Sequence, residues 1–222
     1  MRPLIFVLSA FLPWPLRRRL LNFALRYELH PTCFISRLSF VLPGKLVMNP
    51  HSRIGALTVC KGLELIDVGE NASIGRLNLI TGFPRCQSRH FAQQPDRKPH
   101  LIVGREAAIT NQHIIDCTDA VTIGAFTTFA GSRSQVLTHS IDLTRNIQWC
   151  APVTIGEYAF VGTHSTILPG SVLPPRSILA AMSLLNKPYD IEGYLYAGVP
   201  ARPIKPCTKD VAYFTRSEGY VW

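Results

Sequence analysis

The chain has 222 residues, of which 47% are hydrophobic and 17% are charged, and its formal net charge is +9. This length supplies one hydrophobic core, and the positive charge points to anionic partners: a phosphorylated cofactor, a nucleotide-linked or lipid-linked sugar, or a membrane surface. The basic residues are not interleaved with aromatic ones in any nucleic-acid-binding module, and the six cysteines form neither a disulfide framework nor a zinc pattern. The composition therefore argues against nucleic-acid binding and favours a cytoplasmic protein with reduced thiols.

The first predicted segment is an apolar and basic N-terminal arm, residues 1–50. Its apolar run, residues 4–12, stops at Pro13, well short of the about 20 residues that span a bilayer. Three arginines, Arg17 to Arg19, follow this run, which is the wrong side for a secretory signal. We expect a helical arm that packs on the body or on a neighbouring subunit, with a peripheral membrane contact as the alternative.

A six-residue repeat determines the predicted fold of residues 51–184. An aliphatic residue stands at every sixth position from residue 155, and a small residue follows four positions after each one. The aliphatic series is Ile155, Val161, Ile167, Leu173 and Leu179, and the small series is Ala159, Ser165, Ser171, Ser177 and Ser183. A period of six suits neither an α-helix nor an isolated strand, but it suits a flat-sided prism whose stacked coils pair in parallel. A glycine often follows the aliphatic residue, near a corner where tolerance of unusual φ is useful.

Two stretches interrupt this repeat. Residues 83–101 are polar and basic, and residues 139–152 form an excursion that ends where the repeat restarts at Pro152. Insertions in a solenoid tend to gather on the face that binds ligand, so residues 83–101 either border the functional site or form a solvated basic loop. Residues 139–152 carry the more informative signal.

The second interruption carries a resemblance to a known family. A Thr138-His139 step, an excursion, and a restart that reads PVTIG and then FVGTHSTILPGS resemble the hexapeptide-repeat acyltransferases, above all the galactoside and maltose O-acetyltransferases and the capsule, O-antigen and exopolysaccharide acetyltransferases. The resemblance covers roughly residues 54 to 205. It implies an all-β fold, a single-stranded left-handed parallel β-helix built of hexapeptide repeats, with an N-terminal helical arm and a C-terminal extension.

The resemblance also implies a catalytic role for His139, because the matching histidine is the general base in that family. A neutral imidazole can take the proton of a sugar hydroxyl as it attacks a thioester, which contributes about 10²–10⁴ in rate. The other ring nitrogen needs an acceptor that fixes the tautomer. Asp142 is the nearest carboxylate in sequence, although a backbone carbonyl would serve equally.

A closing motif in the C-terminal segment, residues 185–222, is similar to the part of the family that holds acetyl-CoA. Small residues there, Ala197 and Gly198, permit close approach of the pantetheine, while Arg202 and Lys205 supply charge for the phosphates. Ser183 lies in a segment upstream of this motif that also belongs to the cofactor channel in the family, so we expect it to bind the cofactor as well. Gly162 and Thr163 are expected to bind the cofactor too, and the backbone around them is the expected source of oxyanion donors.

The expected acceptor-binding residues are Asn111 or Gln112, near the place of a sugar-binding asparagine in the family, and Phe160, where the family commonly has tryptophan. Together, these features and the resemblance predict a homotrimeric, cytoplasmic enzyme. If the N-terminal arm contacts a membrane, the enzyme lies at its inner face. It moves an acetyl group directly from acetyl-CoA to a sugar hydroxyl in bacterial surface or exopolysaccharide biosynthesis. N-acetylation of an amino sugar, acylation of serine, and a non-enzymatic β-helix scaffold remain open. No metal is expected, because a zinc hydratase of this fold needs three converging histidines.

Overall fold

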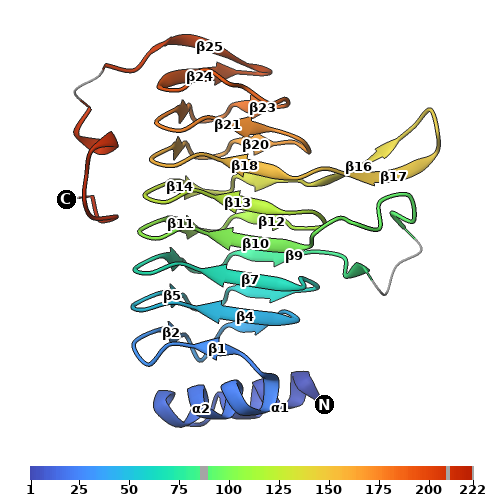
Figure 1. The fold of residues 1–222 in the computed structure, drawn as a ribbon, viewed down its shortest axis with the longest axis vertical. Coiled ribbons are helices and arrows are strands. Elements are labelled where there is room, and N and C mark those ends of the chain that lie inside the picture. Colours follow the sequence, from blue (N-terminus) through green and yellow to red (C-terminus); the bar gives the residue numbers. More distant parts are fainter. Residues whose placement is uncertain (86–89, 209–210, 222) are drawn as a thin grey trace.

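The computed structural model describes residues 1–85, 90–208 and 211–221, and it shows a three-sided parallel β-helix capped by two helices (Figure 1). Successive strands lie on three sheets in turn, so each coil contributes one short strand to each face. The first sheet contains β1 (Glu28–Leu29), β4 (Lys45–Met48), β7 (Leu65–Val68), β10 (His100–Val103), β13 (Val121–Ile123), β18 (Val153–Ile155) and β21 (Val172–Leu173).

The other two sheets complete the prism. The second contains β2 (Phe34–Ile35), β5 (Arg53–Ile54), β8 (Ser73–Ile74), β11 (Ala108–Asn111), β14 (Thr128–Ser132), β19 (Phe160–Val161), β22 (Ile178–Leu179), β24 (Tyr194–Gly198) and β25 (Ala201–Pro206). The third contains β3 (Phe40–Leu42), β6 (Val59–Lys61), β9 (Leu79–Thr81), β12 (Ile114–Asp116), β15 (Gln135–Val136), β20 (Thr166–Ile167) and β23 (Leu184–Leu185).

The core is the column of aliphatic residues that the six-residue repeat predicts. All five members of the series from Ile155 to Leu179 are fully buried, and so are their counterparts in earlier coils. The small residues are also buried, and two of their hydroxyls reach the next coil: Ser165 Oγ donates to the Ala180 carbonyl at 3.0 Å and Ser171 Oγ to the Leu185 carbonyl at 3.0 Å. The prediction of a stacked prism is therefore confirmed.

The repeat glycines serve a different purpose from the one predicted. A Cβ on Gly104 would lie 2.6 Å from the Ala125 nitrogen of the next coil, and one on Gly156 would lie 2.4 Å from the Pro175 nitrogen. The left-handed φ is adopted two residues later instead, at Glu106 (φ 58°) and Tyr158 (φ 54°). Glycine is needed at positions 104 and 156 because adjacent coils approach closely at these points, whereas residues with side chains adopt the left-handed conformation at the corner.

The N-terminal arm is shorter than the predicted 1–50. Residues 28–48 already form β1 to β4, whose register continues into the rest of the prism, for example Glu28 opposite Val47. Leu29, Ile35 and Val41 are buried at the same six-residue spacing. The boundary was misplaced because the glycines that mark later coils are missing from this first one.

Two helices, α1 (Arg2–Ser9) and α2 (Trp14–Leu25), close this end of the prism. Arg17 lies completely buried under the first coil and donates to the Ile35 carbonyl at 3.3 Å and the Ser36 carbonyl at 3.1 Å. Neither of these helices is long and apolar enough to cross a membrane, and the described residues contain no other α-helix.

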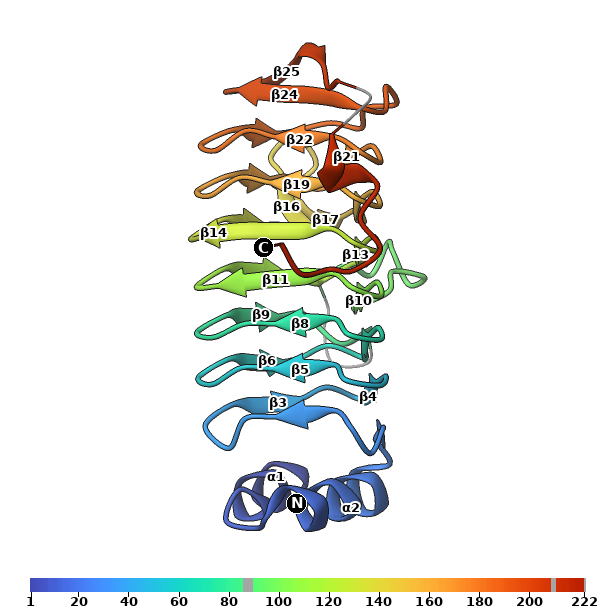
Figure 2. The ribbon, with the colours of Figure 1, turned by 90° about the vertical axis from the view of Figure 1, so that its left-hand side faces the viewer.

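At the other end the prism continues slightly past the predicted boundary at 184. β24 pairs in parallel with β22, and β25 then reverses direction and pairs antiparallel with β24. The tail runs back beside the second sheet (Figure 2), where Tyr213 in the short 3-10 turn Ala212–Phe214 donates to the Ala159 carbonyl at 3.0 Å. The Gly219 nitrogen donates to Glu106 Oε2 at 2.8 Å, so the tail is fixed at two heights.

Candidate active site

Three segments meet where the chain passes from the third sheet to the first, here called the third–first corner. They are the loop 82–99 between β9 and β10, the short turn 117–120 between β12 and β13, and the hairpin of β16 (His139–Asp142) and β17 (Ile147–Cys150) between β15 and β18. The loop and the hairpin project from the same side of the prism (Figure 1). Both predicted insertions thus border one site; residues 86–89 of the first lie outside the described part of the chain.

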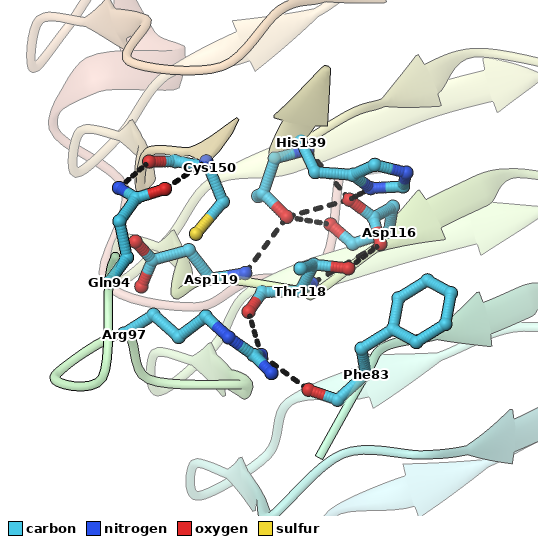
Figure 3. A network of polar contacts seen from close by, with 9 residues as sticks. Phe83, Gln94, Arg97, Asp116, Thr118, Asp119, His139 and Cys150 are labelled. Atoms are coloured by element: carbon cyan, nitrogen blue, oxygen red, sulfur yellow. Dashed lines mark hydrogen bonds and ion pairs between the residues drawn. The ribbon is translucent and has the colours of Figure 1, made fainter. Parts of the chain in front are cut away.

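His139 stands at the base of this hairpin and pairs with Asp116, the last residue of β12. Its Nδ1 lies 2.8 Å from Asp116 Oδ2, with 32% of the imidazole side chain and 8% of the Asp116 side chain exposed. A carboxylate only accepts hydrogen bonds, so Nδ1 carries the proton and Nε2 holds the lone pair in the neutral ring. Figure 3 shows the second nitrogen pointing away from Asp116.

Asp116 is fixed by hydrogen bonds from both neighbouring turns. Thr118 Oγ1 donates to Oδ1 at 2.6 Å, while the Thr138 nitrogen and Thr138 Oγ1 donate to Oδ2 at 2.9 and 2.7 Å. Burial is the largest influence on this carboxyl and raises its pKa, but the hydrogen bonds from His139, Thr118 and Thr138 together outweigh it and hold the pKa below its ordinary value. Asp116 is therefore ionised at neutral pH.

The charge on Asp116 acts back on His139. Its hydrogen bond is the largest influence on the ring and raises the pKa of His139 above the ordinary value, against the opposing effect of partial burial. The imidazole is thus a stronger base than a free histidine, in one tautomer and one orientation.

Two aromatic rings from the loop 82–99 flank the imidazole. The ring centroids of Phe83 and Phe91 lie 6.0 and 5.9 Å from that of His139, both edge to face at 86°. Phe91 is buried, whereas 42% of Phe83 is exposed. The wall beside His139 is therefore apolar, with an accessible ring on its outer side.

Polar contacts fix this loop against the corner (Figure 3). The Gln94 amide donates to the Cys150 carbonyl at 2.7 Å and accepts from the Cys150 nitrogen at 2.7 Å, which joins the loop to the strand opposite His139. Arg97 is 5% exposed; it donates to the carbonyls of Phe83 and Thr118 and lies 4.9 Å over the Phe91 ring. These two side chains keep the aromatic wall in place.

A cleft of about 450 Å³ adjoins the site and shares Phe91, Gln94 and Arg97 with it. Its remaining lining is Glu64, Arg85, His90, Ala92 and Pro95. Its volume falls in the range of small-ligand sites, about 300–1,000 Å³, and it combines an aromatic ring with charged groups.

Asp142, predicted as the residue that orients His139, does not occupy that position. It lies three residues along β16 and accepts from Arg145 Nε at 2.7 Å and from the backbone nitrogens of Thr144 and Arg145. The Asp142 carboxylate therefore closes the tip of the hairpin. Proximity in sequence misled here, because the coil below brings Asp116 to His139 from 23 residues away.

The predicted cofactor residues gather elsewhere on the same chain. Gly162, Thr163 and Ser183 lie where the second sheet passes to the third, here called the second–third corner. The Gly198 nitrogen at the end of β24 donates to Ser183 Oγ at 3.1 Å, so that part of the motif does come together. Ala197 pairs with Arg202 across β24 and β25, and Arg202 and Lys205 are exposed.

The predicted acceptor residues are not at the histidine either. Asn111 and Gln112 lie at the second–third corner, where Asn111 Oδ1 accepts from the Arg76 nitrogen at 2.7 Å. Phe160 lies on the second sheet against Tyr213, with ring centroids 5.9 Å apart. Within one chain, His139 therefore lies on a different side of the prism from the residues predicted to hold the donor and the acceptor.

The remaining histidine near the core has a structural role. His113 is fully buried, its Nδ1 accepts from the Ser134 nitrogen at 3.2 Å, and burial lowers the pKa of His113 to about 4. Among the residues that the structure describes, no three His, Cys, Asp or Glu side chains gather as a metal site.

Known proteins resemble this chain in structure rather than in sequence. No protein-family model and no curated protein matches it. A variant of AntD, an N-acyltransferase from Bacillus cereus in complex with dTDP-4-amino-4,6-dideoxyglucose and coenzyme A, matches with a TM-score of 0.57 at 16% identity over 85% of this chain and 88% of that one.

Two further solved structures agree. The polysialic acid O-acetyltransferase OatWY matches with a TM-score of 0.56 at 14% identity over 88% of this chain and 86% of that one. A hexapeptide-repeat containing acetyltransferase from Vibrio cholerae matches with a TM-score of 0.52 at 18% identity over 92% of this chain and 88% of that one. The predicted fold class is thus confirmed: the chain has the left-handed parallel β-helix fold of the hexapeptide-repeat acyltransferases.

Proposed function

We propose that this protein is an acyltransferase that moves an acetyl group from acetyl-CoA to a hydroxyl of a sugar, with His139 as the general base. The observation that carries the proposal is the Asp116–His139 pair at the one corner where both insertions meet. The fold matches both O- and N-acyltransferases, so the choice between a hydroxyl and an amine acceptor has to be argued from the chemistry of the site.

Asp116 and His139 together can act as a general base. Asp116 holds the Nδ1 proton, which leaves Nε2 to take the proton from the acceptor hydroxyl as its oxygen attacks the acyl carbonyl. The imidazolium then returns this proton to the departing sulfur, and its charge is stabilised by Asp116 in the meantime. No residue of the chain needs to be acylated in this direct transfer.

A sugar hydroxyl, rather than an amine, fits this arrangement best. A hydroxyl needs a base in order to attack at neutral pH, whereas an amine that is already deprotonated needs much less help. Phe83 offers an exposed ring beside the base, where an apolar face of a sugar ring can pack. We therefore propose that the acceptor binds at the third–first corner, beside Phe83.

The donor fits the residues around β24 and β25. When bound, acetyl-CoA supplies an activated thioester together with several phosphates. Arg202 and Lys205 are exposed basic groups for those phosphates, and Gly198, at φ 104°, presents backbone without a side chain. These residues lie on another corner from His139, so we propose a homotrimer in which the His139 corner of one protomer faces the Gly198 corner of the next. We further propose that the reaction takes place in the cytoplasm, in the biosynthesis of a bacterial surface glycan or exopolysaccharide.

The test is acetyl-CoA turnover by the purified full-length protein, followed as thiol release with panels of hydroxyl-bearing and amino-bearing sugars. His139→Ala is expected to lower kcat by about 10²–10⁴ with hydroxyl acceptors. His51→Asn, an exposed histidine at another corner, is the matched control and should leave the rate unchanged.

Three results would contradict the proposal. Full activity in His139→Ala would show that His139 is not the general base, and a burst of acyl-enzyme in rapid-quench experiments would exclude direct transfer. Faster turnover of amino sugars, with little effect of His139→Ala, would replace the hydroxyl by an amine as the acceptor.

A further inference from the structure

The helices α1 and α2 form a flat base across the N-terminal end of the prism (Figure 2). Their inward side is set by burial: Phe6 and Ser9 on α1, and Arg17, Leu21 and Leu25 on α2, are buried. Residues about half a turn away on each helix therefore point out from the end of the rod.

That outward side is apolar and aromatic. Its large side chains are between 49% and 88% exposed and come from both helices and the turn between them: Leu4, Val7, Leu8, Phe11, Leu16 and Phe23. Large apolar side chains gathered on one face of a folded element indicate an interaction surface, whereas single exposed apolar residues scattered over a protein do not.

Two arginines lie on this outward side, whereas Arg17 points into the prism. Residues 1–27 contain Arg2, Arg17, Arg18, Arg19 and Arg26 and no Asp or Glu. Arg19 and Arg26 are exposed and follow the outward side of α2 next to Phe23. An apolar stripe flanked by arginines without acids is the pattern of a helix that lies in the interface of an anionic membrane.

We propose that the helical base binds the surface of an anionic phospholipid bilayer, with α1 and α2 in the plane of the headgroups and the β-helix standing upright on it. A second copy of the chain is a poorer occupant, because a two-fold contact through this face would bring Arg19 and Arg26 of one copy against the same patch of the other. The inference does not depend on the proposed acyl transfer.

An upright rod sets the height of the candidate site. His139 follows β15, four coils above β3 in the third sheet. With strands about 4.8 Å apart and a helix layer of about 10 Å, the imidazole lies roughly 30 Å above the headgroups. An acceptor at that site would then be a soluble sugar or the far end of a long glycan, not the first sugar on a lipid.

The experiment is co-sedimentation of the full-length protein with vesicles of phosphatidylcholine alone or with about one quarter phosphatidylglycerol. We expect binding to the anionic vesicles that weakens with salt. Phe11→Asn with Phe23→Asn, and separately Arg19→Gln with Arg26→Gln, should each weaken it about tenfold or more. Leu57→Asn with Leu77→Asn, two exposed leucines on the second–third corner, is the matched control and should bind like the unmodified protein.

Light scattering and thermal unfolding of each variant accompany the assay. Unmodified protein that does not bind anionic vesicles would overturn the inference, as would equal loss of binding in the Leu57/Leu77 control. A change of oligomeric state in the Phe11/Phe23 variant without vesicle binding would assign the base to a second copy instead.

Discussion

The chemistry of the candidate site rests on a buried carboxylate whose two oxygens both accept hydrogen bonds. Asp116 accepts from two threonines and from His139, at the points where the chain leaves β12 and β15. The consequence for His139 is a fixed tautomer and a raised pKa, which are two separate effects of one group.

Asp116→Asn should separate these effects in kinetics. Because the base must be neutral, activity falls as the pH drops through the pKa of His139, and in the unmodified protein this limb should lie above pH 6.5. Without the carboxylate the limb should move to lower pH, while kcat above it falls about 100-fold or more because the tautomer is no longer fixed. The measurement is kcat and kcat/KM from pH 5 to 9. An unchanged acid limb would mean that Asp116 does not position His139.

At the scale of elements, the site is assembled from excursions that the prism tolerates. The coils on either side keep their pairing, with Val121 opposite Val153 across the hairpin insertion. The loop 82–99 and the hairpin then bind each other through Gln94 and Cys150 rather than through the prism alone. The order of the aromatic wall therefore depends on this contact together with Arg97.

Gln94→Ala removes both hydrogen bonds to Cys150 and should loosen the loop without unfolding the prism. Two such bonds contribute about 1–3 kcal/mol locally, so we expect KM for the acceptor to rise several-fold while kcat changes little. Hydrogen exchange of residues 90–98 should quicken, and the melting temperature should stay within a few degrees. Gln93→Ala, a neighbour on the same loop, serves as the control. Unchanged exchange in Gln94→Ala would show that the loop is held by other contacts such as Arg97.

At the scale of the whole molecule, one prism carries the proposed base and the proposed donor site on different corners. His139 lies at the third–first corner, and Ser183 and Gly198 lie at the second–third corner. A cyclic trimer brings unlike corners of neighbouring protomers together, so each site would draw on two chains.

Mixed trimers test this arrangement. His139→Ala and the double change Arg202→Ala with Lys205→Ala should each be nearly inactive alone. When the two are co-expressed, random mixing leaves intact residues at about a quarter of the subunit interfaces, so about a quarter of the activity should return. The pair His139→Ala and Asp116→Asn, which alter one corner, should show no such recovery. Absence of recovery in the first pair would place both halves of the site in one chain.

The sequence determined those features that depend on local pattern. Inward aliphatic residues at every sixth position specify a prism because each coil buries its own column against the next, and a broken period marks an excursion wherever it occurs. The fold, both insertions and the place of His139 on the second of them follow from that pattern. The first coil escaped it, since Leu29, Ile35 and Val41 carry the period without the glycines.

Only the tertiary structure decided which groups meet. Stacking places Ile115 beside Val136, and this register carries Asp116 to His139, whereas Asp142, three residues from His139, turns to Arg145. The same stacking separates His139 from the Gly198 motif and turns the apolar side of the N-terminal helices outward. Coil register and corner position are properties of the assembled prism, which is why distance along the chain did not predict them.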